Sequence, residues 1–161
     1  MDPANELFPT LSFGGDGQLL EKSIWLDQGR RQQLVTSRYW AKRQTLDAKP
    51  SPTNLILSGD GSSLQELIES TDDGILVTRF WYIRSTDPKT LGFTGMTRDG
   101  SYRIENGVVT NPVVDMRWND SVLRVLNHVA GSGIPVATGE FSAMVMPPLK
   151  VEAFNFTSLS N

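Results

Sequence analysis

Few residues in this sequence have side chains that could carry out metal or nucleophilic chemistry. Histidine occurs once, at position 128, and cysteine does not occur. A zinc ion needs three or four nitrogen, sulfur or oxygen ligands, so the chain cannot build a usual zinc site by itself. A Ser-His-Asp triad would have to use His128, and no serine lies in a Gly-x-Ser-x-Gly turn. We therefore predict no metal-binding, cofactor-binding or catalytic residue in this chain, and we interpret His128 as a surface or boundary residue of a helix.

The acidic residues also have simpler explanations than catalysis. A glycosidase needs two carboxyl groups on facing walls of a cleft, and the sequence cannot place any pair there. Asp99 and Glu105 fall in predicted turns, and Asp120 directly precedes a predicted helix. The other candidates are Asp72, Asp73 and Asp115. An independent glycosidase therefore has little support beside turn and cap roles for these residues.

Two further patterns could bind ligands but are better explained as structure. The segment Ser58-Gly59-Asp60-Gly61 is rich in glycine, but it lacks the lysine and the following Ser or Thr of a phosphate-binding loop. We interpret it as a turn. Tryptophans could form a stacking platform, although they are more often core anchors with one polar edge satisfied. The four in this chain are Trp25, Trp40, Trp81 and Trp118.

Composition and charge narrow the classes of protein further. The chain has 161 residues, of which 39% are hydrophobic and 20% charged, and its net charge is −3. This length predicts a single domain over residues 1–161, with an irregular lead-in over 1–14. A protein that neutralises phosphates needs a clustered basic surface, so we expect no nucleic-acid partner. We interpret the basic residues as a solvated face; they are Arg30, Arg31, Arg38, Lys42 and Arg43.

The sequence predicts no contact with membranes. No window of about 18 residues is apolar throughout. The first residues, MDPANELFP, lack the apolar segment of a signal peptide. The absence of cysteine is compatible with a reducing compartment. We therefore expect a cytoplasmic protein.

Turn residues and hydrophobic patterns predict many short strands and few helices. Asn106-Gly107 is the strongest hairpin signal, because both central residues of a type I′ turn need a positive φ. Ser63 and Glu66 have the spacing of a capping box, at the start of a helix that Gly74 is expected to end. The other expected elements are a hairpin over 20–35 that turns at 27–29, a helix over 36–44 capped by Thr36 or Ser37, strands over 54–60 and 74–85, a meander of three or four strands over 92–117 with a turn at Arg98-Asp99-Gly100, a helix over 121–131 ended by glycine, and strands over 143–146 and 149–156.

These elements predict a β-rich α+β fold, with an antiparallel meander or barrel-like sheet and two or three short helices. Strands and helices do not alternate regularly along the chain, which disfavours a doubly wound sheet. A β-rich domain without an active site of its own would be a binding or scaffold module, or part of something larger.

Several segments, taken in order, resemble the C-terminal region of the TldD/PmbA family, whose members are called modulators of DNA gyrase and are described as zinc metalloproteases. The resemblance extends over about residues 15–158. The order and spacing of the segments carry it, since no single segment is specific. The segments are Asn54-Leu-Ile-Leu with Gly59, Glu66-Leu-Ile, Gly74-Ile-Leu-Val-Thr, Thr97-Arg-Asp-Gly, Ile104-Glu-Asn-Gly, Pro112-Val, Arg117-Trp-Asn-Asp and Pro148-Leu-Lys-Val.

The resemblance implies a longer parent protein whose zinc site lies outside this chain. In active members, a helix upstream of the matched region carries His-Glu-x-x-x-His, and a cysteine ligand comes from a glycine-rich stretch that corresponds to residues 131–141 here. This chain has neither the motif nor the cysteine. Zinc is therefore expected only in the full-length parent, and no metal ligand or catalytic residue can be transferred to a position of this chain.

The same resemblance leaves two functions open. The chain is either the C-terminal domain of a peptide-processing metallopeptidase, inert by itself, or a non-catalytic interaction subunit that partners an active TldD-type protease. The missing cysteine favours the second function. The partners that the resemblance implies are the N-terminal domain of the parent, a second copy or a paralogous subunit, and a peptide substrate bound as an added strand.

Overall fold

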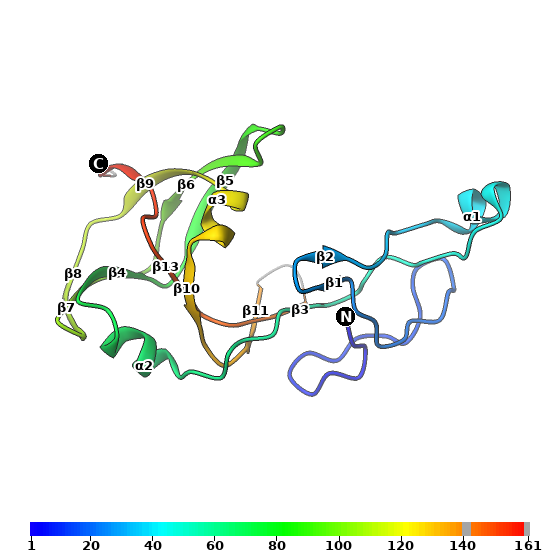
Figure 1. The fold of residues 1–161 in the computed structure, drawn as a ribbon, viewed down its shortest axis with the longest axis horizontal. Helices are drawn as coiled ribbons and strands as arrows, with labels where there is room; N and C mark the ends of the chain where they lie inside the picture. The colour runs from blue at the N-terminus through cyan, green and yellow to red at the C-terminus, as the bar shows by residue number, and fades with distance from the viewer. Residues whose placement is uncertain (140–142, 160–161) are drawn as a thin grey trace. The chain divides into compact units, whose positions relative to one another are not determined.

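The computed structural model describes residues 1–139 and 143–159, which fold as two compact units (Figure 1). Unit 1 contains residues 1–59 and 135–147, and unit 2 contains residues 60–134 and 148–161. Across the described residues, short strands predominate and there are three short helices. This confirms the β-rich α+β class, although the strands form five separate sheets and not one closed barrel. The single domain expected over residues 1–161 stays a prediction.

Unit 1 consists of short strands, one helix and long irregular segments. Strands β1 and β2 form the expected hairpin, and β12 pairs antiparallel with β11 and parallel with β3. The helix expected over 36–44 is also confirmed, with Ser37 as its N-cap, whereas the strand expected over 54–60 is reduced to β3. The bounds are β1 Leu26–Asp27, β2 Arg30–Arg31, α1 Arg38–Gln44, β3 Leu55–Ile56, β11 Val136–Thr138 and β12 Met144–Met146.

A buried amide fastens the irregular N-terminal segment to unit 1. The Asn54 side chain is 1% exposed, and its Nδ2 donates hydrogen bonds to the carbonyls of Asp2 at 2.7 Å and Phe8 at 3.0 Å. Its Oδ1 accepts a third bond from Asp2 N at 3.0 Å. These bonds satisfy main-chain groups that no helix or strand pairs, which explains how residues 1–14 keep a defined path without regular structure.

One long antiparallel ribbon, interrupted near its middle, organises unit 2. β4 pairs with β7 in one half, and β5 pairs with β6 in the other. Across the interruption, Arg98 N donates to Arg79 O at 3.0 Å and Thr78 N donates to Gly100 O at 3.1 Å. The two chains of the ribbon therefore stay side by side from one half to the other. The bounds are β4 Asp73–Val77, β5 Phe80–Asp87, β6 Gly92–Thr97 and β7 Ser101–Glu105.

This pairing corrects two expectations. The strand expected over 74–85 is two strands, β4 and β5, which belong to different sheets. The turn at Arg98-Asp99-Gly100 does not reverse the chain, because β6 and β7 do not pair with each other. Instead, it connects β6 in one sheet to β7 in the next. Asp99 and Gly100 have φ of 61° and 141°. Sequence cannot separate such an offset from a hairpin turn, since both use Asp and Gly at positive φ.

The remaining strands of unit 2 include the hairpin that the sequence predicts most strongly. Asn106 and Gly107 turn β7 into β8 with φ of 50° and 78°, as a type I′ turn requires. β9 and β14 complete a four-stranded sheet in the order β14-β9-β6-β5, and β10 pairs with β13. The bounds are β8 Val108–Pro112, β9 Met116–Ser121, β10 Val129–Ser132, β13 Leu149–Val151 and β14 Phe156–Leu159.

Helix α2 (Leu64–Glu69) ends earlier than expected. The hydroxyls of Ser70 and Thr71 both donate to the carbonyl of Leu67, at 2.9 and 2.8 Å. These side chains satisfy a carbonyl of the last turn and compete with continuation of the helix. Gly74, which was expected to end the helix, lies inside β4.

The capping box at Ser63 and Glu66 is confirmed, because each side chain bonds the other residue's main-chain N–H. Helix α3 (Val122–Asn127) is also shorter than expected, and Gly131 lies in β10 instead of ending it. Strand pairing with β13 accounts for this difference. In the part of the chain that the structure describes, no helix is long and apolar enough to span a membrane.

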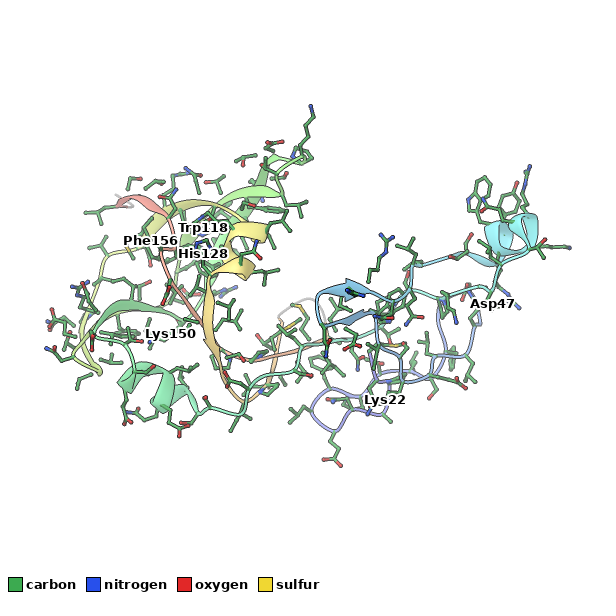
Figure 2. The ribbon with its side chains drawn as sticks, viewed as in Figure 1. Lys22, Asp47, Trp118, His128, Lys150 and Phe156 are labelled. Atoms are coloured by element: carbon green, nitrogen blue, oxygen red, sulfur yellow. The ribbon has the colours of Figure 1, made fainter. Side chains whose placement is uncertain are left out.

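An aromatic cluster forms the core of unit 2 (Figure 2). Trp118 is 7% exposed, and its ring lies 5.4 Å from Phe80 in an edge-on arrangement and 5.6 Å from Phe154. Gly95 is the cross-strand partner of Trp118. A Cβ atom at position 95 would lie 2.8 Å from the indole ring. Glycine therefore permits the close approach of β6 to this ring.

We expect the substitution Gly95→Ala to destabilise the fold by roughly 1–3 kcal/mol, the usual cost of overpacking a core. The measurement is the free energy of unfolding in urea, followed by tryptophan fluorescence. Gly15→Ala is the matched control, because a Cβ there meets no atom within 4 Å. Equal unfolding free energies for Gly95→Ala and the wild type would contradict this account of the core.

Candidate functional site

The only histidine occupies a structural position at the end of α3 (Figure 2). Its main-chain N–H donates to Val125 O at 3.0 Å, and its Nδ1 lies 2.7 Å from Arg124 O. One ring nitrogen is therefore engaged with a carbonyl of the helix. The side chain is exposed and has no carboxylate partner among the described residues. The interpretation of His128 as a surface residue at the end of a helix agrees with these contacts.

Among the described residues, the carboxylates that the sequence singles out come together only in pairs: Asp99 and Asp115 line one pocket, and Asp73 and Glu105 both contact Arg103. Asp99 pairs with Arg79 at 2.7 Å and lies 3.5 Å from Arg98, whereas Glu105 lies 3.6 Å from Arg103. Within residues 1–139 and 143–159, no group of three or more His, Cys, Asp or Glu residues could hold a metal ion. The described residues therefore do not fit the zinc site that the family resemblance implies elsewhere in the parent.

Asp60, in the glycine-rich turn, binds main-chain N–H groups through its side chain. Its two carboxylate oxygens accept hydrogen bonds from Ser62 N at 3.0 Å and Ser132 N at 2.9 Å. These bonds from Ser132 and Ser62 lower the pKa of Asp60 to about 2. Asp60 also donates its own N–H to Ser132 Oγ at 2.9 Å. The side chain thus links the start of unit 2 to β10, as a turn residue does.

Asp120 is the most completely bonded carboxylate in unit 2. Its side chain is 1% exposed and forms an ion pair with Arg124, four residues later on α3. Ser121 N donates to Oδ1 at 2.8 Å and Asn155 N donates to Oδ2 at 3.0 Å. Burial raises the pKa of Asp120, but the hydrogen bonds from Arg124, Asn155 and Ser121 outweigh burial and hold the pKa below its usual value of 3.8. This residue joins β9, α3 and the segment before β14.

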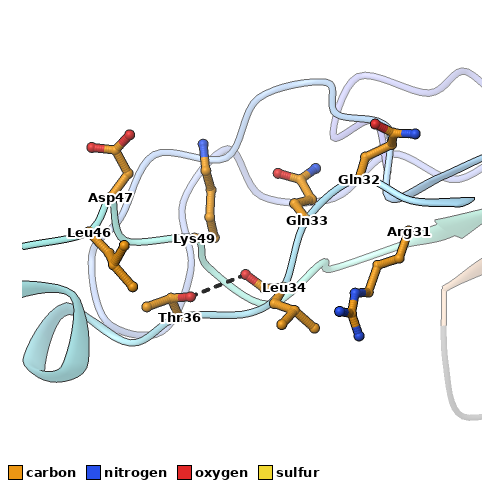
Figure 3. A pocket seen from close by; sticks show the side chains of 8 residues that line it. All are labelled: Arg31, Gln32, Gln33, Leu34, Thr36, Leu46, Asp47 and Lys49. Atoms are coloured by element: carbon orange, nitrogen blue, oxygen red, sulfur yellow. Dashed lines mark hydrogen bonds between the residues drawn. The ribbon is translucent and has the colours of Figure 1, made fainter. Parts of the chain in front are cut away.

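A polar pocket of about 430 Å³ lies in unit 1 (Figure 3). The side chains of Arg31, Asp47 and Lys49 carry charge at its wall, and Leu34 and Leu46 supply its apolar part. The dashed line in Figure 3 marks a hydrogen bond that Thr36 Oγ1 donates to Leu34 O at 3.3 Å. These charges do not converge on one bonded centre, so the pocket offers no catalytic arrangement.

A second pocket, in unit 2, brings together residues that the sequence left apart. We call this cavity of about 340 Å³ the Trp81 pocket; Trp81, Tyr82 and Met96 line its apolar side, and Thr97, Arg98, Asp99 and Asp115 its polar side. The guanidinium groups of Arg79 and Arg98 lie 4.4 and 5.1 Å from the centre of the Trp81 ring. Trp81 is therefore half-buried beside charges and is not the core anchor expected of it.

Sequence reasoning did not single out this pocket as a site. Arg98 and Asp99 were expected only to form a turn, and Asp115 was given only a turn or cap role. The signal that could have found them is the closely spaced aromatic and basic run Arg79-Phe-Trp-Tyr-Ile-Arg opposite Thr97-Arg-Asp. Their association still depends on the pairing of β5 with β6, which local patterns do not predict.

A large amount of apolar surface remains exposed in both units. In unit 1, more than half of the side-chain surface of Leu11, Phe13 and Trp40 is accessible. In unit 2, the helix α3 exposes Leu123 and Leu126 to a similar degree. The apolar residues that are buried among the described residues are Leu20, Ala41, Ile68, Ile104, Trp118 and Val145. Within the irregular lead-in, Leu7, Leu11 and Phe13 are thus exposed, whereas Phe8 is half-buried.

Comparisons with known proteins identify the fold. A family model described as the PmbA/TldA metallopeptidase C-terminal domain matches residues 1–158. TldE from Thermococcus kodakarensis is similar over 99% of this chain and 38% of that chain, with 18% identity and a TM-score of 0.79. A candidate modulator of DNA gyrase from Bacteroides thetaiotaomicron is similar over 93% of this chain and 33% of that chain, with 24% identity and a TM-score of 0.75.

A third solved structure has the same relation to this chain. It is a candidate modulator of DNA gyrase from Thermotoga maritima, similar over 92% of this chain and 36% of that chain, with 18% identity and a TM-score of 0.75. The chain thus spans well under half the length of each of these three proteins. No curated protein matches the sequence.

The lowered pKa of Asp120 predicts a loss of stability in acid. Because folding lowers this pKa, Asp120 stabilises the folded state above the usual carboxyl value of 3.8, and this contribution is lost as the pH falls through the folded-state pKa. We expect Asp120→Asn to be less stable at pH 7 by roughly 1–3 kcal/mol, the usual cost of disturbing a buried hydrogen-bonded group. Its unfolding free energy should also change less between pH 6 and pH 3.

Urea unfolding at several pH values measures both effects. Asp72→Asn is the control, because Asp72 is exposed and, among the described residues, its carboxylate accepts no hydrogen bond and forms no ion pair. Other carboxylates with lowered pKa, such as Asp60, contribute to the acid response of both proteins equally. A wild-type protein and an Asp120→Asn variant with parallel pH dependence would contradict the role assigned to Asp120.

Proposed function

The chain belongs to the family of PmbA/TldA metallopeptidase C-terminal domains, and on this premise we propose that it is the non-catalytic wall of a peptide-processing metallopeptidase. In this proposal the longer parent protein carries the metal and the reacting groups, and this chain supports the substrate. The exposed apolar surface of both units carries the proposal. A chain that spans 33–38% of three similar solved proteins is expected to leave such surface for the rest of its parent to cover.

The exposed side chains are too many to be incidental. They include large residues from every part of the described chain, such as Leu11, Trp40, Leu123 and Val136. Burying one such side chain stabilises a protein by roughly 1.5–3 kcal/mol, so a domain or subunit that covered several of them would stabilise the assembly. The apolar surface therefore favours contact with another domain or subunit.

The wall would hold a peptide through strand pairing. In the four-stranded sheet of unit 2, β5 and β14 are the edge strands, so one side of each has main-chain groups that no strand of this sheet pairs. An extended peptide can add to such an edge through main-chain hydrogen bonds. No side chain of this chain needs to react with the peptide in this role.

A non-catalytic subunit that partners an active paralogue is the second candidate. The observation that favours it is the absence of cysteine from the whole chain, including the glycine-rich stretch over 131–141. The resemblance places a zinc-binding cysteine in that stretch in active members. A second copy or a paralogous subunit would then cover part of the apolar surface, and the cytoplasm is the proposed location.

Metal content and peptide cleavage test the first function. After dialysis against zinc-containing buffer, the 161-residue chain should retain no stoichiometric zinc by mass spectrometry and should not cleave fluorescent casein, because its donor set is incomplete. The full-length parent should cleave casein and should lose this activity with a chelator. The matched control is the parent with both motif histidines replaced by alanine.

Three results decide between the functions. Tightly held stoichiometric zinc in the 161-residue chain would overturn the claim that it lacks a metal site. A parent without a His-Glu-x-x-x-His segment, active only after a paralogous subunit is added, would favour the partner function. A parent that carries the motif but has no chelator-sensitive activity, alone or with the paralogue, would overturn both functions.

A further inference from the structure

Of the three charged residues that line the Trp81 pocket, Arg98 contacts Asp99 but forms no ion pair with Asp115. We propose that the pocket binds a dipolar ligand, namely a short peptide or amino acid with a free ammonium group, a free carboxylate and an apolar side chain. The site rests on the pocket alone and does not require the proposed peptidase function.

Arg98 has donors available for a carboxylate. Among the described residues, its charge contact runs from Nε to Asp99 Oδ1 at 3.5 Å, whereas the other Asp99 oxygen binds Arg79 at 2.7 Å. Within the described part of the chain, the Arg98 guanidinium donates no hydrogen bond. Its position over the Trp81 ring keeps the planar group at the pocket wall. A guanidinium with free N–H groups can bind a carboxylate through two parallel bonds.

Asp115 provides the negative charge that an ammonium group of the ligand would meet. Its Oδ1 contacts Thr97 Oγ1 at 3.2 Å, and Thr97 Oγ1 accepts a hydrogen bond from Met116 N at 2.9 Å. Because its oxygen already accepts from Met116, the Thr97 hydroxyl can donate its proton to Asp115. Thr97 is 0% exposed, so this contact holds the carboxylate in one orientation. Among the described residues, Asp115 has no cationic partner, and an ammonium group would supply one.

The apolar wall suits the body of such a ligand. Trp81 and Tyr82 stand edge to face, with ring centres 5.9 Å apart and planes at 86°, and Met96 lines the same cavity. The volume of about 340 Å³ lies near the lower end of small-molecule sites, which span roughly 300–1,000 Å³. The site therefore fits a dipeptide better than a folded partner.

The backbone is strained at Tyr82, one of the residues that line the pocket. Tyr82 has φ of 52°, a left-handed conformation that is unfavourable for an aromatic residue. It lies where the pairing of β5 with β6 shifts register, between Trp81 and Arg84. The Arg84 guanidinium lies 5.6 Å from the ring centre. Such strain persists where surrounding contacts hold it, and it is concentrated at functional sites.

The dipeptide Phe-Ala is the probe for the experiment. Its affinity for the 161-residue chain is measured by calorimetry, beside N-acetyl-Phe-Ala, Phe-Ala amide and the doubly blocked peptide. Acetylation removes the ammonium group that would pair with Asp115, and amidation removes the carboxylate that would pair with Arg98. We expect each block to weaken binding about tenfold or more, as for the loss of a charged hydrogen bond.

Variants assign each end of the ligand to one residue. In the Asp115→Asn variant, acetylation of the peptide should no longer weaken binding, whereas amidation should weaken it as in the wild type. The reason is that asparagine carries no charge but can still accept the hydrogen bond from Thr97. Arg98→Gln should show the reverse pattern. Arg117→Gln and Asp72→Asn are the matched controls, because both residues are exposed and neither lines the pocket; they should bind all four peptides as the wild type does.

Several outcomes would overturn the assignment. The assignment fails if Phe-Ala does not bind, or if the doubly blocked peptide binds as tightly as Phe-Ala. It also fails if only one of the two blocks weakens binding, or if the blocks weaken binding to Arg98→Gln and Asp115→Asn as much as they weaken binding to the wild type. Thermal unfolding of each variant shows that it is folded, and the conservative change at Asp115 keeps the test valid if Arg98→Gln does not fold. Casein cleavage by the parent is a separate readout, so failure of this site and failure of the proposed function are distinguishable.

Discussion

The arrangement of unit 2 depends on the interruption of its long ribbon between Thr78 and Gly100. Two main-chain hydrogen bonds bridge it, from Arg98 N to Arg79 O and from Thr78 N to Gly100 O. The Thr78 hydroxyl also donates to Gly100 O at 2.8 Å, and a Cβ at position 100 would approach that hydroxyl to 3.0 Å. Because of the interruption, the two chain segments of the ribbon belong to one sheet on one side of it and to another sheet on the other side. The interruption also brings Arg79, Arg98 and Asp99 close to Trp81.

A second constraint is the burial of polar groups that tie distant segments together. Asp120 joins β9, α3 and the chain before β14 in unit 2, and Asn54 joins the N-terminal segment to unit 1. Each replaces the pairing that a longer strand or helix would have provided. Only a few apolar residues are buried among the described residues, and many large apolar side chains are exposed. In the proposed function, a larger assembly would cover this apolar surface.

The two functional conclusions draw on different parts of this architecture. The proposal of one domain in a larger peptide-processing protein draws on the family, the partial length relative to solved relatives and the exposed apolar surface. The Trp81 pocket depends on local geometry within unit 2, where aromatic side chains, a guanidinium and a carboxylate line one cavity. The chemistry of the two is related, since both concern peptides, but the observations behind them are independent.

The sequence by itself determined the features that depend on neighbouring residues. The turns at Gln28-Gly29 and Asn106-Gly107, the capping box of Ser63 with Glu66 and the β-rich class follow from backbone preferences and hydrogen bonds within a few positions. Only the tertiary structure decided which strands pair, why Gly74 lies in a strand, and that Trp81, Arg98 and Asp115 share a pocket. These outcomes join residues far apart in the chain, and the same Asp-Gly pattern can reverse a chain or merely offset it. The long-range hydrogen bonds of the ribbon, which no local pattern encodes, select between the two.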